Sequence, residues 1–159
     1  MTAANALHAA LELARAGLAV FPCAHNKIPT TPHGFRDASA DGETVQALWR
    51  RHGGSLVGVR TGAASNLAVL DVDAKHASAK QWWADNRQRL PPTRTHRTPG
   101  GGLHLIFAHA EGLRCSTSKL ARGIDVKAEK AARFGGRRPA CRCCMRVRPH
   151  RGRHGCSLS

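Results

Sequence analysis

The chain has 159 residues, a formal net charge of +15 and 42% hydrophobic residues. This length suffices for one compact domain with a real core, and no stretch is long and apolar enough to predict a transmembrane helix. The N-terminus lacks the pattern of an export signal, so we expect a cytoplasmic protein without a membrane partner. The excess positive charge predicts a polyanionic partner, above all a nucleic acid.

The charge divides the chain into two regions. Residues 1–128 contain 16 lysines and arginines against 9 acidic residues, whereas residues 129–159 contain 9 against 1. Four of the six cysteines also lie in the second region. We therefore expect a folded domain over 1–128 and a separate, basic Cys/Arg-rich tail over 129–159.

The first part of the chain predicts two helices and a short strand. Thr2 is placed to cap a first helix, and Gly17 is placed to end it. A buried strand covers 18–23, and a loop rich in Pro, Thr, His and Gly covers 24–40. Asp41 is a typical N-cap for the second helix, which runs to a Gly-Gly pair.

The second part predicts mainly strands. Five segments have the composition of strands: 55–62, 67–73, 93–98, 103–109 and 123–128. One helix, over 76–90, turns Trp82 and Trp83 partly toward the core and ends at a Pro-Pro pair. Helices and strands do not alternate strictly, which favours an α+β fold over a doubly wound sheet.

The strand LAVLDVD at 67–73 carries two acids in an apolar run. Because successive strand residues point to opposite faces, Asp71 and Asp73 share one face and Leu70 and Val72 the other. Two carboxylates this close repel each other unless a cation lies between them, and oxygen ligands suit Mg²⁺ or Mn²⁺. The alternative is a strand end where both acids meet solvent.

Two later strands carry polar residues in the same manner. His104 follows a run of three glycines, where backbone can approach a ligand closely, and its imidazole could donate to a phosphate oxygen. The alternative is a histidine bonded to a loop carbonyl. In GIDVKA, Asp125 and Lys127 share one face, opposite Ile124 and Val126.

An acid pair, a glycine-led histidine and a third acid, in this order, resemble the archaeo-eukaryotic primase superfamily. The closest resemblance is to the bifunctional DNA primase/polymerase (prim-pol) domains of plasmid, phage and other mobile-element replication proteins. It runs from about Ala6 to Lys127 and rests on these segments: ALELARAGLAVFPC, NKIPTTPHGFRDAS, VGVRTG, LAVLDVD, PPTRTHRTPGGGLHLIF and GIDVKA. It implies a primase-polymerase catalytic core over 1–128, with a mixed sheet flanked by helices.

The resemblance also implies roles for individual residues. Asp71, Asp73 and Asp125 would be the catalytic, metal-binding acids, and His104 would contact the phosphates of the incoming nucleotide. Further nucleotide-binding roles would fall to Lys27, Thr98, Gly100, Gly101 and Lys127. The implied chemistry is nucleotidyl transfer from nucleoside triphosphates on a DNA template and primer, with two Mg²⁺ or Mn²⁺ ions. A replicative helicase would be a possible partner.

Basic residues around such a cleft could hold the DNA backbone with salt-sensitive affinity. The candidates are Arg60, Arg94, Arg97, Arg114, Lys119 and Arg122. For any single one of them, a solvated surface position is the simpler interpretation. Together with the tail, they support an alternative function, a non-catalytic basic fragment that binds nucleic acid by charge alone.

The chain departs from the family pattern near Glu129. The family continues with a Gly-Gly turn and an apolar strand, whereas residues 129–159 are dominated by Arg, Gly, Cys and His. This composition is typical of a shifted reading frame in a GC-rich gene, so we expect a C-terminally truncated domain, with activity weakened or lost, and a disordered tail.

Two other interpretations of the tail stay open. It could be a basic arm that binds nucleic acid non-specifically. It could also be a small zinc-binding module built from Cys141, Cys144, His150 and His154, although the gap between the two pairs is shorter than in common zinc fingers.

Overall fold

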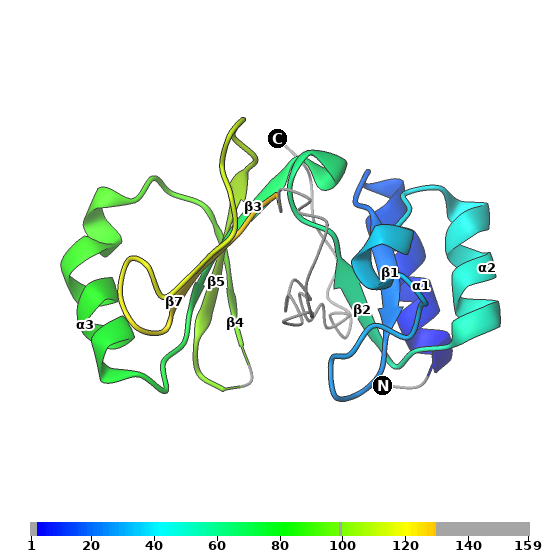
Figure 1. Ribbon diagram of the computed structural model, residues 1–159, viewed down its shortest axis with the longest axis horizontal. Coiled ribbons are helices and arrows are strands. Elements are labelled where there is room, and N and C mark those ends of the chain that lie inside the picture. The colour runs from blue at the N-terminus through cyan, green and yellow to red at the C-terminus, as the bar shows by residue number, and fades with distance from the viewer. Residues whose placement is uncertain (1–2, 99, 130–159) are drawn as a thin grey trace, which may run out of the picture. The chain divides into compact units, whose positions relative to one another are not determined.

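The computed structural model describes residues 3–98 and 100–129, and these fall into two compact units with a boundary between Gly58 and Val59 (Figure 1). The predicted cap at Thr2 and the tail beyond Glu129, with its expected disorder and its Cys/His group, lie outside the described residues. No helix in the described ranges is long and apolar enough to cross a membrane.

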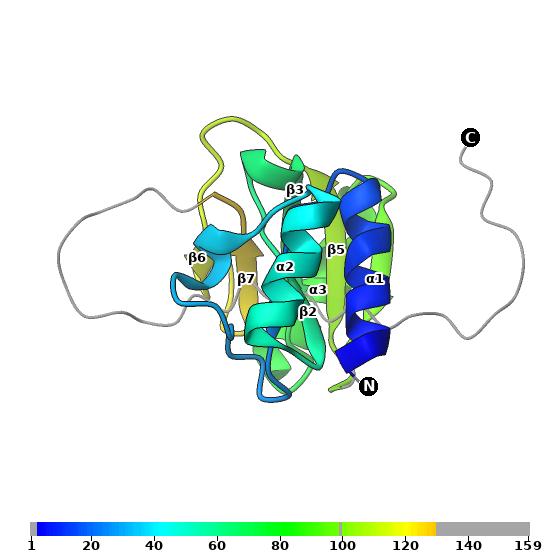
Figure 2. The ribbon, with the colours of Figure 1, turned by 90° about the vertical axis from the view of Figure 1, so that its right-hand side faces the viewer.

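The N-terminal unit packs two helices against a small sheet. Its elements are α1 (Ala3–Arg15), β1 (Val20–Cys23), the 3-10 helix η1 (Gly34–Asp37), α2 (Gly42–His52) and β2 (Leu56–Val59), whose last residue lies past the boundary, with β1 beside β2. Figure 2 shows α1 and α2 side by side. The fully buried Ala6 and Ala10 have small side chains on α1, which lets a neighbouring helix approach closely.

Asp41 caps α2 as the sequence predicted. Its Oδ2 accepts hydrogen bonds from the Thr44 backbone amide at 2.8 Å and from the Thr44 hydroxyl at 2.7 Å. These two hydrogen bonds favour the ionised carboxylate and hold the pKa of Asp41 below its ordinary value. The cap therefore makes stability depend on pH.

Asp41→Asn should flatten that dependence. Because the pKa of Asp41 is lower in the folded state, its carboxylate contributes fully to the free energy of unfolding above the unfolded-state pKa of about 3.9. This contribution is lost as the pH falls through the folded-state pKa. Asparagine caps as well but does not titrate. Thermal unfolding followed by circular dichroism from about pH 2 to about pH 6 should show a steeper loss of Tm in the wild type, and parallel curves would contradict this.

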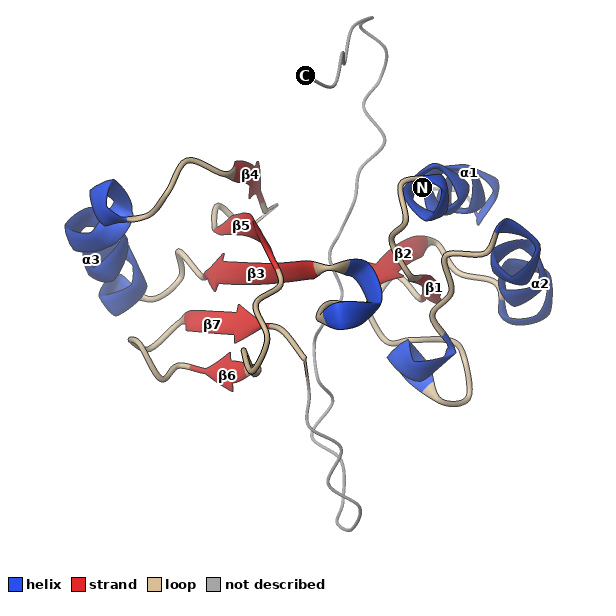
Figure 3. Cartoon of the chain, turned by 90° about the horizontal axis from the view of Figure 1, so that it is seen from above, coloured by secondary structure: helices blue, strands red, loops and turns tan. Residues whose placement is uncertain are grey.

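The C-terminal unit is a five-stranded sheet with one helix against it. It contains β3 (Leu67–Val72), α3 (Ala77–Asn86), β4 (Arg94–Arg97), β5 (Leu103–Ala108), β6 (Ser116–Thr117) and β7 (Ile124–Lys127), with the 3-10 helices η2 (Ala63–Ser65) and η3 (Arg87–Arg89). The strand order is β4-β5-β3-β7-β6 (Figure 3). The strand that carries LAVLDVD is thus the central one.

The α+β class is confirmed, but the sheet differs from the expected one. Each neighbouring pair in the five-stranded sheet is antiparallel, and β1 and β2 form a second sheet, so the described residues contain no single sheet of mixed direction. The short strand β6 was not predicted from the sequence, because two residues carry no readable period.

One face of the five-stranded sheet is the apolar core of this unit. Leu70, Val72, Leu105 and Ile124 are buried on it together with Ala79 of α3. Trp82 and Trp83 pack against this cluster from α3, as predicted. Because strand residues alternate, the side chains between these apolar positions are directed to the opposite face.

Candidate functional site

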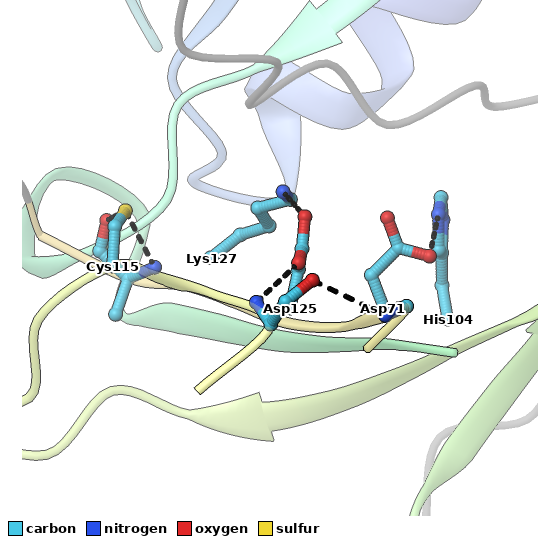
Figure 4. A network of polar contacts seen from close by, with 8 residues as sticks. Asp71, His104, Cys115, Asp125 and Lys127 are labelled. Carbon is cyan, nitrogen blue, oxygen red and sulfur yellow. Dashed lines mark hydrogen bonds and ion pairs between the residues drawn. The ribbon is translucent and has the colours of Figure 1, made fainter. Parts of the chain in front are cut away.

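Three polar residues lie in one row across the centre of the five-stranded sheet. Asp71 on β3 is directly opposite His104 on β5 and directly opposite Asp125 on β7. Directly opposed residues of antiparallel strands share a face of the sheet, and Figure 4 shows the three side chains rising from the same face. Three positions that the sequence scatters over 55 residues are therefore brought side by side by strand pairing.

Asp71 and His104 form the first contact of this row. His104 Nε2 lies 3.4 Å from Asp71 Oδ1, and the side chains are 18% and 29% exposed, respectively (Figure 4). Both side chains are thus partly shielded but still reachable from solvent. A carboxylate beside a ring nitrogen orients the imidazole, as it does for histidines that bind metals or phosphates.

Asp125 and Lys127 form the second contact. Lys127 Nζ donates to Asp125 Oδ2 at 2.6 Å, and the Ser118 backbone amide donates to Asp125 Oδ1 at 3.0 Å (Figure 4). Ser118 adopts a left-handed backbone conformation with φ of 53°. Both oxygens of Asp125 therefore have a protein donor.

Asp73 lies just past the end of β3. Its backbone amide donates to the Gly123 carbonyl at 2.8 Å, so it extends the β3–β7 pairing by one step. Its Oδ1 accepts from the Lys75 amide at 3.0 Å, and its carbonyl accepts from the His76 amide at 3.1 Å. Asp73 thus shapes the turn that leads into α3, besides carrying a carboxylate near the row.

The turn before β5 closes between Thr98 and Gly102. The Thr98 amide donates to the Gly102 carbonyl at 2.8 Å, and the Gly101 amide donates to the Thr98 carbonyl at 3.0 Å. A Cβ on Gly102 would lie 2.4 Å from the Val72 carbonyl oxygen, whereas one on Gly100 would meet nothing closer than 3.7 Å. Sequence reasoning named Gly100 and Gly101 and missed Gly102, which is the glycine that the close packing requires.

Lys27 belongs to the N-terminal unit. It adopts φ of 70° in the loop after β1, and its amide donates to the Ala24 carbonyl at 2.9 Å. The row lies in the C-terminal unit, so the nucleotide-binding role expected of Lys27 stays a prediction. A surface hollow elsewhere in the N-terminal unit, along α2, contains none of the predicted site residues; it is lined by Glu43, Thr44, Gln46, Ala47 and Arg50.

The strand register adds two residues to the row that the sequence did not suggest. His96 on the edge strand β4 is opposite His104, and Thr117 on β6 is opposite Asp125. Only strand pairing could reveal them, since the residue opposite each depends on how distant strands align. Most of the candidate DNA-binding residues are exposed, namely Arg94, Arg97, Arg114, Lys119 and Arg122, and Arg60 is half-buried.

The donor chemistry of the row fits a hard divalent cation. Asp71 and Asp125 present carboxylate oxygens on neighbouring strands, and both side chains are partly exposed. Within the described part of the chain, however, no three His, Cys, Asp or Glu side chains are grouped so that they could hold a metal ion. Lys127 and the Lys75 amide occupy oxygens that such an ion would use.

Comparison with known proteins identifies a family. The model of the family described as bifunctional DNA primase/polymerase, N-terminal, matches residues 10–134, which is most of the chain. No curated protein and no solved structure matches. The matched range includes most of the N-terminal unit, the described part of the C-terminal unit and the whole row.

Proposed function

Because this chain belongs to the family of bifunctional DNA primase/polymerase N-terminal domains, as its motifs predicted, we propose that it is a metal-dependent nucleotidyltransferase that extends a strand on a DNA template. Family membership implies DNA and nucleotides as substrates. The observation that best supports catalysis is the row of His104, Asp71 and Asp125 on one face of the sheet. Such a row places carboxylates next to a donor for phosphate oxygens.

The three acids would hold Mg²⁺ or Mn²⁺. Asp71 and Asp125 would supply ligands from β3 and β7, and Asp73 would join them by giving up the Lys75 amide. A bound pair of such ions lowers the pKa of the attacking hydroxyl and stabilises the charge on the leaving oxygen. No dedicated protein base is then required.

The other residues of the site would position the triphosphate. The primer 3′-oxygen forms a bond to the α-phosphorus while the bond to pyrophosphate breaks, and the hydroxyl proton passes to water. His104, oriented by Asp71, would donate from its ring to a phosphate oxygen. The turn from Thr98 to Gly102 would let the phosphates approach the backbone, and Lys127 would add positive charge.

Divalent-dependent nucleotide incorporation by the purified chain tests this function. A labelled primer on a DNA template, supplied with ribo- or deoxynucleoside triphosphates and Mg²⁺ or Mn²⁺, should be extended, and EDTA should stop the extension. Activity that persists in EDTA would exclude the proposed mechanism.

A second candidate function is non-catalytic DNA binding. It is favoured by the occupation of both Asp125 oxygens and by the lack of a three-residue metal group in the described residues. Binding of this kind would have a steep salt dependence and would not change with EDTA. If the chain binds DNA in this way but does not extend the primer, its function is non-catalytic DNA binding.

Three further proposals rest on the resemblance alone. They are a role in the replication of a mobile element, a helicase as partner, and truncation of the domain near Glu129. Comparing the activity of this chain with a version in which the family's next strand is restored would test the last of these.

A further inference from the structure

Lys127 occupies the place where a cation would be expected. Its ammonium lies 2.6 Å from Asp125 Oδ2, and its side chain is only 14% exposed. Lys127 and Asp125 are two positions apart on β7, so their side chains leave the strand on the same face (Figure 4). The pair is local to one strand and requires no other element to bring it together.

The attraction between Lys127 and Asp125 is stronger than that of a fully exposed ion pair, because both side chains are mostly shielded from solvent. Asp125 is 23% exposed, so water screens the two charges less than it screens a fully exposed pair. An ammonium and a divalent cation repel each other and require the same carboxylate oxygen. Asp125 Oδ1 accepts from the Ser118 amide, so one of its two lone pairs is also in use. Lys127 and a divalent cation therefore compete for the Asp125 carboxylate.

We propose that Lys127 is a built-in counter-ion that lowers the affinity of the site for divalent cations until a triphosphate anion draws the ammonium away from Asp125. This inference rests on the proposed function. A flexible four-carbon stem lets a lysine exchange one anionic partner for another, and a phosphate oxygen is a strong acceptor for it. Nucleotide and metal would then favour each other's binding through Lys127, and linkage makes this coupling reciprocal.

Mn²⁺ binding, followed by electron paramagnetic resonance of the free ion, tests the competition without measuring activity. Lys127→Met should bind Mn²⁺ about 5-fold more tightly than the wild type in the absence of nucleotide. Lys80→Met is the matched control, because it removes the same charge from an exposed position on α3. Lys127→Gln gives a second variant if methionine at this position prevents folding.

A non-hydrolysable nucleoside triphosphate tests the second half of the proposal. The nucleotide chelates Mn²⁺ itself, so the variants are compared at equal nucleotide concentration. Nucleotide should increase Mn²⁺ affinity more in the wild type and in Lys80→Met than in Lys127→Met. Equal increases in all three proteins would overturn the inference. So would a Mn²⁺ affinity of Lys127→Met, measured without nucleotide, that is no higher than that of Lys80→Met.

One further variant separates this inference from the proposed function. Asp71→Asn/Asp125→Asn should lose Mn²⁺ binding, because it removes both ligand carboxylates of the row. Unchanged Mn²⁺ binding in this double variant would refute the metal site itself. Loss of binding there, together with equal behaviour of Lys127→Met and Lys80→Met, would refute only the role of Lys127.

Discussion

Asp71→Asn is expected to lower the rate of template-directed nucleotide incorporation by about 100-fold or more. Asp71 lies on the central strand and is opposite both His104 and Asp125, so its carboxylate serves the metal and also orients the histidine. Asparagine has the same shape but no charge, so the fold should be retained. Single-turnover extension of a labelled primer measures the effect.

Asp85→Asn is the matched control for this prediction. Asp85 is an exposed residue of α3 whose Oδ1 accepts from Gln81 Nε2, so its replacement makes the same charge change outside the site. It should leave the rate within about 2-fold of the wild type, because surface substitutions of this kind have small effects. An Asp71→Asn rate equal to that of Asp85→Asn would mean that catalysis does not use the row.

Gly102→Ala is expected to destabilise the C-terminal unit by about 1–3 kcal/mol or more and to disturb the start of β5. A Cβ at this buried position would lie 2.4 Å from the Val72 carbonyl oxygen and 3.1 Å from Thr98 Oγ1. Backbone cannot yield as a flexible side chain can, so the strand that carries His104 must shift. Chemical denaturation followed by tryptophan fluorescence, with Trp82 and Trp83 packed against this core, measures the loss.

Gly100→Ala tests whether the effect comes from this close approach. Gly100 lies in the same turn, but its added Cβ would make only an ordinary contact with Lys75 Cε at 3.7 Å. Its free energy of unfolding should change by no more than about 0.5 kcal/mol. If both variants lose the same stability, the turn as a whole, and not the contact between Gly102 and Val72, limits substitution.

The alternation of polar and apolar residues was sufficient to predict which face each strand presents. Asp71 and Asp125 alternate with Val72 and Ile124, and the structure buries the two apolar residues in the core beneath the row. The start of α2 followed equally well from a local signal, the cap at Asp41, whereas α3 ends at Asn86, before the predicted end at the Pro-Pro pair. These features depend on neighbours within a few residues, which is the range that a single sequence reveals.

Features that depend on contacts between distant segments could not be predicted. β1 and β2 pair with each other and not with the five-stranded sheet, and His96 lies opposite His104 through the pairing of β4 with β5. Both results depend on which strands pair and in which register. The need for glycine at position 102 arises from the backbone of Val72, thirty positions earlier in the chain. The hydrogen bond between Lys127 and Asp125 depends on side-chain conformations, which strand alternation does not predict.

Primer extension by the wild-type chain and by Asp71→Asn/Asp125→Asn, both confirmed as folded and both supplied with Mn²⁺ and nucleoside triphosphates, tests the central claim most directly. The proposed function predicts extension by the wild type and none by the double variant, because the row would then lack its two facing carboxylates. Equal extension by both proteins, or none by the folded wild type, would contradict it.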